Sequence, residues 1–385
     1  MDVEIGRGKK GRRAYGFDDI AIVPSRRTRD VDDVDITWKL GPHTLRIPCL
    51  ASAMDGVVSP SFAITMGRLG GLAVLNLEGL WTRYEDADEQ LERIASLPKE
   101  TATRTMQEIY REPVKAELVA RRVEEIKDGG VLAAASLTPQ RVAEYYKVAL
   151  EAGLDVLVVQ GTVVSAEHVS SKAESLDLKK FIADCPVPVI VGGVASYATT
   201  LHLMRTGAVG VLVGVGPGHA CTTRGVLGIG VPQATAIADA SAARIQHLLE
   251  TGQYCNVIAD GGMRTGGDVA KAVALGADAV MIGSPLASAA EAPGRGYHWG
   301  MATFHPELPR GTRVKAGTKG TLEEILVGPA HENDGTLNLF GALRTSMATC
   351  GYETLQAFQK AEVMVAPALM TEGKKLQREQ DVGMG

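Results

Sequence analysis

The sequence predicts an α/β protein in which eight parallel strands close into a (β/α)8 TIM barrel. Short apolar runs alternate with helix-like segments over about 240 residues. Four of these runs open with a glycine directly after a helix-like segment, where a helix C-terminus favours positive φ. The runs are continuously apolar, as strands buried on both faces of a parallel sheet require. A doubly wound open sheet is the alternative, but eight strands favour the barrel.

The predicted strands follow one another along the chain, with helical segments between them. In order, the strands cover residues 47–51, 70–75, 131–137, 153–158, 187–191, 207–212, 255–259 and 276–281. The glycines that open four of them are Gly70, Gly153, Gly207 and Gly276. The clearest helices between them cover residues 61–69, 140–152, 197–206 and 267–275.

Two connections are longer than one helix. Residues 80–130 contain charged amphipathic segments, which predict solvated outer helices. Residues 288–340 follow the eighth strand without clear periodicity, and at the C-terminal face of a barrel such a stretch predicts an active-site flap. We expect residues 1–385 to form one barrel domain, with residues 371–385 as a mobile or intersubunit tail.

The composition argues against several functional classes. A formal net charge of −5 and a pI near 6.0 disfavour a nucleic-acid-binding protein. No apolar run reaches the roughly 20 residues of a membrane span, and the opening MDVEIGRGKKGRR lacks the apolar core of a signal peptide. Five scattered cysteines fit a reducing cytoplasm better than a disulfide framework. We therefore expect a cytoplasmic protein that acts on a small molecule, without a nucleic-acid or membrane partner.

Glycines after the seventh and eighth strands indicate a place for a phosphate group. The two sequences are Asp260-Gly261-Gly262 and Gly283-Ser284. Backbone N–H groups of these two loops often bind phosphate in barrels, although plain tight turns are the alternative interpretation. Asp260 would repel a phosphate and is better suited to a ribose hydroxyl pair. The combination suggests a nucleotide monophosphate as ligand.

Cys221 lies in a glycine-rich, polar loop, GVGPGHACTTR, after the sixth strand. The nearby Arg224 would favour a thiolate, so Cys221 is a candidate nucleophile. From spacing alone, Cys221 could also be an inert packing residue. We interpret the other four cysteines in that way. The glycines match a dinucleotide fingerprint only loosely, because they do not open a βαβ unit. Zinc-hydrolase and P-loop motifs are absent from the sequence.

Four segments together resemble the IMP dehydrogenase/GMP reductase family. They are YGFDDIAIVPS, ASAMDGV, GVGPGHACTTRGVLGIGVPQATA and IADGGMRTGGDVAKAVALGADAVMIGSPLA. More narrowly, the chain resembles the shorter IMP dehydrogenase-related branch without a CBS module. The resemblance covers nearly the whole chain. It implies a TIM barrel that acts on purine nucleotides and assembles as a homotetramer or an octamer.

The resemblance implies covalent chemistry on IMP. The family's cysteine, here Cys221, attacks C2 of the hypoxanthine ring, hydride passes to NAD⁺, and water releases XMP. Thr223 matches a threonine that helps to activate water. Arg310 or Arg313 is our suggested substitute for a flap Arg-Tyr pair that has no clear counterpart here. The positions that match IMP-binding residues are Ser52, Met54, His219, Asp260, Gly261, Gly262, Gly283, Ser284, His298, Gly300 and Met301.

The same resemblance implies two cofactors, NAD and a monovalent cation. The nicotinamide side of NAD corresponds to Gln160, Gly214, Val215 and Gly216. The ligands of a cation such as K⁺ correspond to the carbonyls of Gly216, Gly218 and Cys221 and to Glu372 from a neighbouring subunit. Carbonyl oxygens suit a hard ion of this kind.

Several positions depart from the family's pattern. His219 stands where a phosphate-binding serine is usual, and Gln160 stands where an aspartate touches the nicotinamide side. His298 and Ala302 replace a tyrosine and a glycine, and Arg310 replaces a glutamate. The 50 residues between the second and third strands are too few for the paired CBS module, so nucleotide control through such a module is not expected.

Three functions remain open from the sequence. The leading one is NAD-dependent oxidation of IMP to XMP in guanine nucleotide biosynthesis. A GMP reductase would use the same cysteine with NADPH and release ammonia; the missing Arg-Tyr pair fits it, whereas the cysteine loop and VPQATA favour the dehydrogenase. A purine-nucleotide-binding pseudoenzyme is suggested by Gln160, His219 and the altered flap. The preference between NAD and NADP also stays open.

Overall fold

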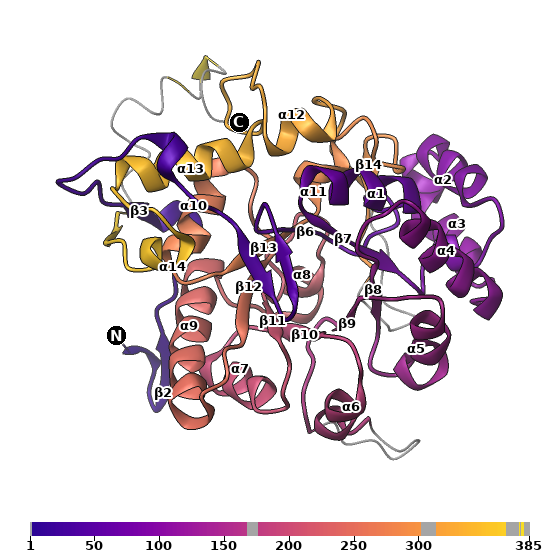
Figure 1. Ribbon diagram of the computed structural model, residues 1–385, viewed down its shortest axis with the longest axis horizontal. Coiled ribbons are helices and arrows are strands. Elements are labelled where there is room, and N and C mark those ends of the chain that lie inside the picture. The colour runs from indigo at the N-terminus through magenta and orange to yellow at the C-terminus, as the bar shows by residue number, and fades with distance from the viewer. Residues whose placement is uncertain (1, 168–175, 302–312, 367–376, 378, 381–385) are drawn as a thin grey trace.

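Eight parallel strands form a closed barrel at the centre of the molecule (Figure 1). The computed structural model describes residues 2–167, 176–301, 313–366, 377 and 379–380. The barrel strands are β6 (Cys49–Ala51), β7 (Leu72–Asn76), β8 (Ala134–Leu137), β9 (Val156–Gln160), β10 (Val189–Val194), β11 (Gly210–Val213), β12 (Asn256–Asp260) and β13 (Ala279–Ile282). Each predicted apolar run contributes one strand, and β13 pairs with β6 to close the ring. The predicted TIM barrel is confirmed.

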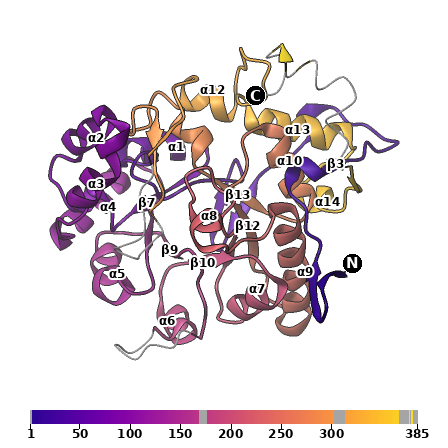
Figure 2. The same ribbon diagram turned by 180° about the vertical axis from the view of Figure 1, so that it is seen from behind.

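Helices follow the strands and surround the barrel, as both ribbon views show (Figures 1 and 2). They are α1 (Pro60–Leu69), α2 (Ala87–Ser96), α3 (Lys99–Ile109), α4 (Ala116–Asp128), α5 (Val142–Glu151), α6 (Leu178–Asp184), α7 (Tyr197–Met204), α8 (Thr223–Leu227), α9 (Gln233–Thr251) and α10 (Gly266–Ala274). Within the described ranges, none of the helices has both the length and the hydropathy to span a bilayer.

Local sequence signals set where these helices begin and end. The Ser59 hydroxyl accepts a hydrogen bond from the Phe62 amide at the start of α1, which satisfies one of the free N–H groups there. Gly70 ends α1 with φ of 98°, and Gly276 follows α10 with φ of 111°. These left-handed conformations suit glycine, as the sequence predicted for helix-to-strand junctions.

The chain continues beyond the last barrel strand along one side of the molecule. Its elements are α11 (Ser284–Ala287), β14 (Tyr297–His298), β15 (Val314–Lys315), α12 (Leu322–Leu326), α13 (Leu339–Thr349), α14 (Leu355–Phe358) and β16 (Val363–Val365). Before the barrel lie β1 (Asp2–Gly6), β2 (Lys9–Arg12), β3 (Ile20–Ile22), β4 (Trp38–Leu40) and β5 (His43–Leu45). Part of the predicted flap, residues 302–312, and most of the predicted tail lie outside the described residues.

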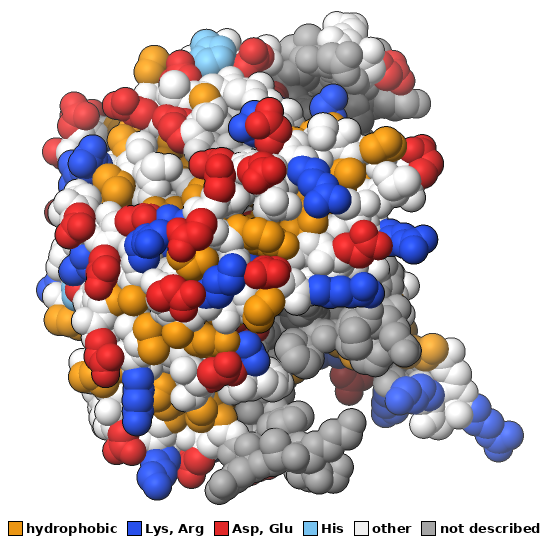
Figure 3. Space-filling view, turned by 90° about the vertical axis from the view of Figure 1, so that its right-hand side faces the viewer, with side chains coloured by type: hydrophobic (Ala, Val, Ile, Leu, Met, Phe, Trp, Pro, Cys, Tyr) orange, Lys and Arg blue, Asp and Glu red, His pale blue; other side chains and the backbone are white. Residues whose placement is uncertain are grey.

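Helices α2, α3 and α4 occupy the segment between β7 and β8. Figure 3 shows acidic and basic side chains interspersed over the face that they cover, where Arg104 pairs with Glu108 and Arg121 with Glu85. Their opposite faces bury the apolar side chains of Leu91, Ile94, Met106, Ile109, Val119 and Val123. The amphipathic pattern of residues 80–130 accounts for both faces.

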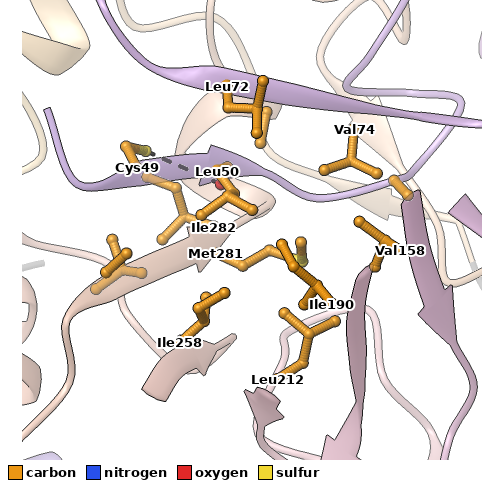
Figure 4. Close-up of a cluster of buried hydrophobic side chains, with 14 of the residues drawn as sticks. Cys49, Leu50, Leu72, Val74, Val158, Ile190, Leu212, Ile258, Met281 and Ile282 are labelled. Atoms are coloured by element: carbon orange, nitrogen blue, oxygen red, sulfur yellow. Dashed lines mark hydrogen bonds between the residues drawn. The ribbon is translucent and has the colours of Figure 1, made fainter. Parts of the chain in front are cut away.

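The interior of the barrel is filled by apolar side chains that point toward one another (Figure 4). Leu50, Val158, Ile190, Leu212 and Met281 are fully buried there. A parallel barrel of eight strands is just wide enough for such side chains to fill it, so its centre is a packed core and not a pore.

Side chains alternate along a strand, so the residue two positions further on faces the same way. Asn76, Gln160 and Asp260 each follow an inward apolar residue by two positions and end β7, β9 and β12. Their polar groups therefore lie on top of the apolar filling, at the C-terminal end of the barrel.

The other end of the barrel is covered by the hairpin of β4 and β5. Trp38 Nε1 donates to Asn256 Oδ1 at the start of β12, 2.9 Å away. Trp38 and Leu40 are buried in this contact region. The hairpin closes the N-terminal end and leaves the C-terminal end for a ligand.

Candidate active site

A cavity of about 810 Å³ opens at the C-terminal ends of the barrel strands. A volume of this size is typical of ligand sites. Almost all of the predicted site residues that the structure describes line it. They are Ser52, Met54, Gln160, Gly214, Gly216, Gly218, His219, Cys221, Thr223, Asp260, Gly261, Gly262, Gly283, Ser284, His298, Gly300 and Met301.

A few predicted residues are not brought to the cavity wall. Val215 is buried and does not line it. Arg310 and Glu372 lie outside the described residues. Arg313, the other suggested substitute for the flap pair, donates to the carbonyls of Ala95 and Leu97 at the end of α2, at 3.0 and 2.6 Å. The Arg313 guanidinium therefore caps the C-terminal end of α2.

Cys221 is the exposed cysteine of the chain and lines the cavity. Its thiol donates to Thr223 Oγ1 across 3.2 Å, and its N–H donates to the Gly218 carbonyl across 3.0 Å. Burial raises the pKa of the Cys49 and Cys255 thiols, which lie in the core. The exposure of Cys221 keeps it the candidate nucleophile, whereas the two buried cysteines are packing residues.

Glycines bring the backbone close to the cavity on the β12 and β13 side. Gly261 and Gly262 have φ of 78° and 83° and lie against Pro217 of the cysteine loop. A Cβ added to Gly283 would lie 2.9 Å from Met54 Sδ. Side chains would fill this part of the cavity, whereas glycine leaves room for a ligand beside the backbone.

Asp260, at the end of β12, is one of the acidic residues that line the cavity. Gln160 Nε2 donates to its Oδ2 across 3.3 Å, and Gln233 Nε2 donates to its backbone carbonyl across 3.2 Å. Burial disfavours the charged carboxylate and raises the pKa of Asp260 to about 7, although the Gln160 amide opposes this change. The carboxyl group titrates near neutral pH when no ligand is bound.

Two histidines stand together on the wall between the cysteine loop and β14. The ring centroids of His219 and His298 are 5.9 Å apart, and His298 Nε2 lies 2.7 Å from Ser284 Oγ. His298 Nδ1 is buried without a hydrogen-bond partner among the described residues. Burial lowers the pKa of His298 to about 4, and the nearby His219 adds to this effect. His298 is therefore neutral at pH 7 and has a free ring nitrogen.

Sequence analysis missed a second group of cavity residues, on the side of β7 and α3. Tyr110, the residue after α3, donates its hydroxyl to Asp55 Oδ2 across 2.5 Å and accepts from Trp299 Nε1 across 2.7 Å. Arg83 lies over the Tyr110 ring at 6.0 Å, and both line the cavity. Asp55 belongs to the ASAMDGV segment that carries part of the family resemblance. Nothing in the helical pattern of residues 80–130 marks Tyr110 as part of a site.

Comparison with known proteins adds a family match over most of the chain. The model of a family described as "IMP dehydrogenase / GMP reductase domain" matches residues 14–375. This range contains every residue of the cavity wall.

Individual relatives cover nearly the whole chain. A protein from Mycolicibacterium smegmatis named "Uncharacterized oxidoreductase" is 48% identical over 94% of this chain and 99% of its own. Inosine-5'-monophosphate dehydrogenase from Cryptosporidium parvum is 30% identical over 89% of this chain and 90% of its own. The crystal structure of an IMP dehydrogenase/GMP reductase-like protein from Corynebacterium glutamicum superposes with a TM-score of 0.90 at 46% identity, over 94% of this chain and 97% of that chain.

Proposed function

We propose, since this chain belongs to the IMP dehydrogenase/GMP reductase family, that it oxidises inosine 5'-monophosphate to xanthosine 5'-monophosphate with NAD⁺. The observation that carries the proposal is the exposed thiol of Cys221, bonded to Thr223 in a cavity that glycine-rich loops also line. A nucleophile, a hydroxyl beside it and a nucleotide-sized space occur together there.

The cavity wall supports one orientation of the nucleotide. Gly262, Gly283 and Ser284 offer backbone and hydroxyl groups to the phosphate, and His298 lies behind Ser284, with Nε2 2.7 Å from its hydroxyl. Asp260, two residues before Gly262, is in reach of the ribose hydroxyls that follow the phosphate. The purine then extends toward Cys221 and Met301.

The proposed reaction conserves atoms and charge. The Cys221 sulfur, after losing its proton, forms a bond to C2 of the hypoxanthine ring. The hydride that leaves C2 is accepted by NAD⁺. Water then adds to C2 and the carbon–sulfur bond breaks, which gives XMP and the free thiol. The sum is IMP, NAD⁺ and water giving XMP, NADH and a proton. The Thr223 hydroxyl, 3.2 Å from the Cys221 sulfur, supports a role in the water step.

The residues present fit a dinucleotide beside the purine. The cavity continues past Cys221 to Gln160, Gly214 and Gly216, the positions that the resemblance assigned to nicotinamide. The wall also includes Arg83, which donates to the Glu78 carbonyl across 3.0 Å, and Arg141, which pairs with Glu144 across 2.9 Å. A mononucleotide alone would leave this side of the cavity unused.

A monovalent cation such as K⁺ fits the chemistry of the cysteine loop. The Gly218 carbonyl accepts the Cys221 amide, so the loop forms a tight turn that is rich in backbone oxygens. With the carbonyls of Gly216 and Cys221, and with Glu372 from a neighbouring subunit of a cytoplasmic homotetramer or octamer, this donor set would hold the ion and stiffen the loop.

The direct test is turnover in both directions with purified protein. We expect NADH to form from IMP and NAD⁺, and NADPH to persist with GMP. Cys221→Ala is expected to abolish NADH formation while calorimetry still detects IMP binding, and Cys185→Ala, a half-buried thiol outside the cavity, serves as the matched control. NADPH oxidation with GMP would assign a reductase instead. IMP binding by the wild type without turnover and without a Cys221 adduct would assign a pseudoenzyme.

A further inference from the structure

The hydroxyl group of Tyr110 joins three parts of the chain that are distant in sequence. Its single proton goes to Asp55 Oδ2, its oxygen accepts from Trp299 Nε1, and Met301 Sδ lies 3.4 Å away. Asp55 follows β6 and Trp299 follows β14, whereas Tyr110 comes from the helices between β7 and β8. One phenol group thus connects the outer helices to two sides of the cavity.

The segment around Trp299 contacts the substrate side of the cavity at both ends. At one end His298 bonds to Ser284, beside the loops that would hold the phosphate. At the other end Gly300 is so close to the cysteine loop that an added Cβ would lie 3.2 Å from the Ala220 carbonyl oxygen. Fixing Trp299 therefore fixes Gly300 and Met301 over the purine end of the cavity.

The partners of Tyr110 are shielded from water. Trp299 and Asp55 are each 1% exposed, and Asp55 Oδ1 already has no hydrogen-bond partner among the described residues. Removing the phenol oxygen would leave the buried indole N–H of Trp299 unpaired and would leave Asp55 Oδ2 with the Leu80 amide as its donor, 2.9 Å away. A buried donor is costly to leave unsatisfied. The segment would shift to find other partners.

We propose that Tyr110 is a positioning residue that holds the Trp299–Met301 segment in place for nucleotide binding. The inference rests on the proposed function and adds a role for the outer helices, which supply part of the site as well as covering the barrel. Figure 1 shows α3 on the same side of the barrel as β7 and β14, consistent with this contact.

The experiment compares two tyrosine hydroxyls on the same helical segment. Tyr110→Phe removes the hydroxyl between Asp55 and Trp299. Tyr84→Phe removes a hydroxyl that donates to the Ile109 carbonyl across 2.8 Å and does not line the cavity. We expect Tyr110→Phe to weaken IMP binding by about tenfold and to raise the KM for IMP equally, with kcat within about twofold, because Gly300 and Met301 contact the nucleotide before and during reaction. Tyr84→Phe should change the affinity for IMP, the KM for IMP and kcat by no more than about twofold each.

A second variant tests the same hydrogen bond from its other end. Trp299→Phe removes the indole N–H, and its effect on IMP binding should not multiply with that of Tyr110→Phe in the double variant, because the two residues act through one contact. If Tyr110→Phe folds poorly, Trp299→Phe alone still tests the contact, because it removes the N–H that Tyr110 accepts.

The proposal is overturned if Tyr110→Phe binds IMP like the wild type, if Tyr84→Phe weakens binding as much, or if the two effects multiply. IMP binding is measured by calorimetry without NAD⁺. A wild type that binds IMP but does not turn over counts against the proposed function only, whereas a Tyr110→Phe protein with wild-type affinity counts against the positioning role only.

Discussion

Gln160 on β9 donates a hydrogen bond to Asp260 on β12, 3.3 Å away across the top of the barrel filling. Between the two lie Gly192 on β10, the register partner of Gln160, and Gly214, which directly follows β11. Neither glycine has a side chain to separate the pair. Among the described residues, Asp260 has this neutral amide and no cationic side chain as a partner, which is why burial dominates its pKa.

The raised pKa of Asp260 predicts a pH-dependent stability. In the folded, unliganded protein the carboxyl pKa is about 7, whereas in the unfolded chain it is about 3.9. The folded state therefore holds a proton that the unfolded state releases, so the contribution of Asp260 is fully present below about pH 4 and is lost as the pH rises through 7. We expect Asp260→Asn to raise the free energy of unfolding by about 2 kcal/mol at pH 8 and little at pH 4, measured by urea unfolding over a pH series.

Asp334 provides a control of opposite sign for that experiment. Although burial opposes it, Lys319 and Thr336 lower the pKa of Asp334 to about 2, and Lys319 Nζ lies 2.6 Å from the carboxylate. Asp334→Asn should destabilise the protein at pH 8 and lose its effect as the pH falls toward 2. If the unfolding free energies of the wild type and Asp260→Asn changed in parallel with pH, the raised pKa of Asp260 would be contradicted.

The contact between Cys221 and Thr223 predicts a defect in the water step. Thr223→Val keeps the volume but removes the hydroxyl 3.2 Å from the sulfur, so release of XMP from the cysteine should slow by about 10². Rapid mixing should then show a burst of NADH followed by slow turnover. Thr223→Ser retains the hydroxyl and should keep turnover close to that of the wild type. A uniform loss of both phases would argue against a separate role in hydrolysis.

The close approach at Gly214 predicts that even one methyl group will disturb the site. A Cβ there would lie 2.2 Å from the Asp260 backbone oxygen, so Gly214→Ala must displace the end of β12. We expect the KM for IMP to rise about tenfold or more. Gly267→Ala, whose Cβ would meet only the Thr265 hydroxyl at 3.7 Å, is the matched control and should leave KM unchanged. Equal KM values for the two variants would contradict the prediction.

The buried ion pair of Arg244 and Asp278 predicts a variant that loses stability but not chemistry. Asp278 is 1% exposed and accepts from Arg244 at 2.7 Å, from Tyr254 at 2.6 Å and from the Val257 amide at 2.8 Å. Asp278→Ala leaves the buried guanidinium of Arg244 without its carboxylate partner and should cost about 3–5 kcal/mol of unfolding free energy. The KM for IMP should not change where the variant is folded.

The exposed pair of Arg205 and Glu250 is the comparison for that measurement. Their side chains are 2.8 Å apart but remain partly exposed, at 48% and 32%. Glu250→Gln should therefore change the unfolding free energy by less than about 1 kcal/mol. If both substitutions had the same small effect, the buried pair would not be the stabilising contact that its geometry indicates.

The barrel was predictable because each of its signals is local. Gly70 and Gly276 mark helix ends within a few residues of the strands that follow, and a continuous apolar run indicates burial on both faces. The place of Asp260, Gly261 and Gly262 in the site was also predictable, because parallel strands place their C-terminal ends on one face of a barrel. Local sequence was sufficient for these parts.

The remaining part of the site depends on contacts between distant segments. The partner of Gln160 is 100 residues away, and the partners of Tyr110 are 55 and 189 residues away. A helical pattern shows which face of α3 is apolar, but it does not show that the residue after the helix reaches the cavity. The neutral state of His298 likewise follows from its burial in the folded chain and not from its neighbours in sequence.

The hairpin that carries Trp38 limits the directions from which ligands can reach the cavity. With the barrel plugged by residues such as Leu212 and covered at the far end, the described residues leave no passage from one side of the barrel to the other. Ligands therefore enter and leave the space above Asp260 from the C-terminal side of the barrel.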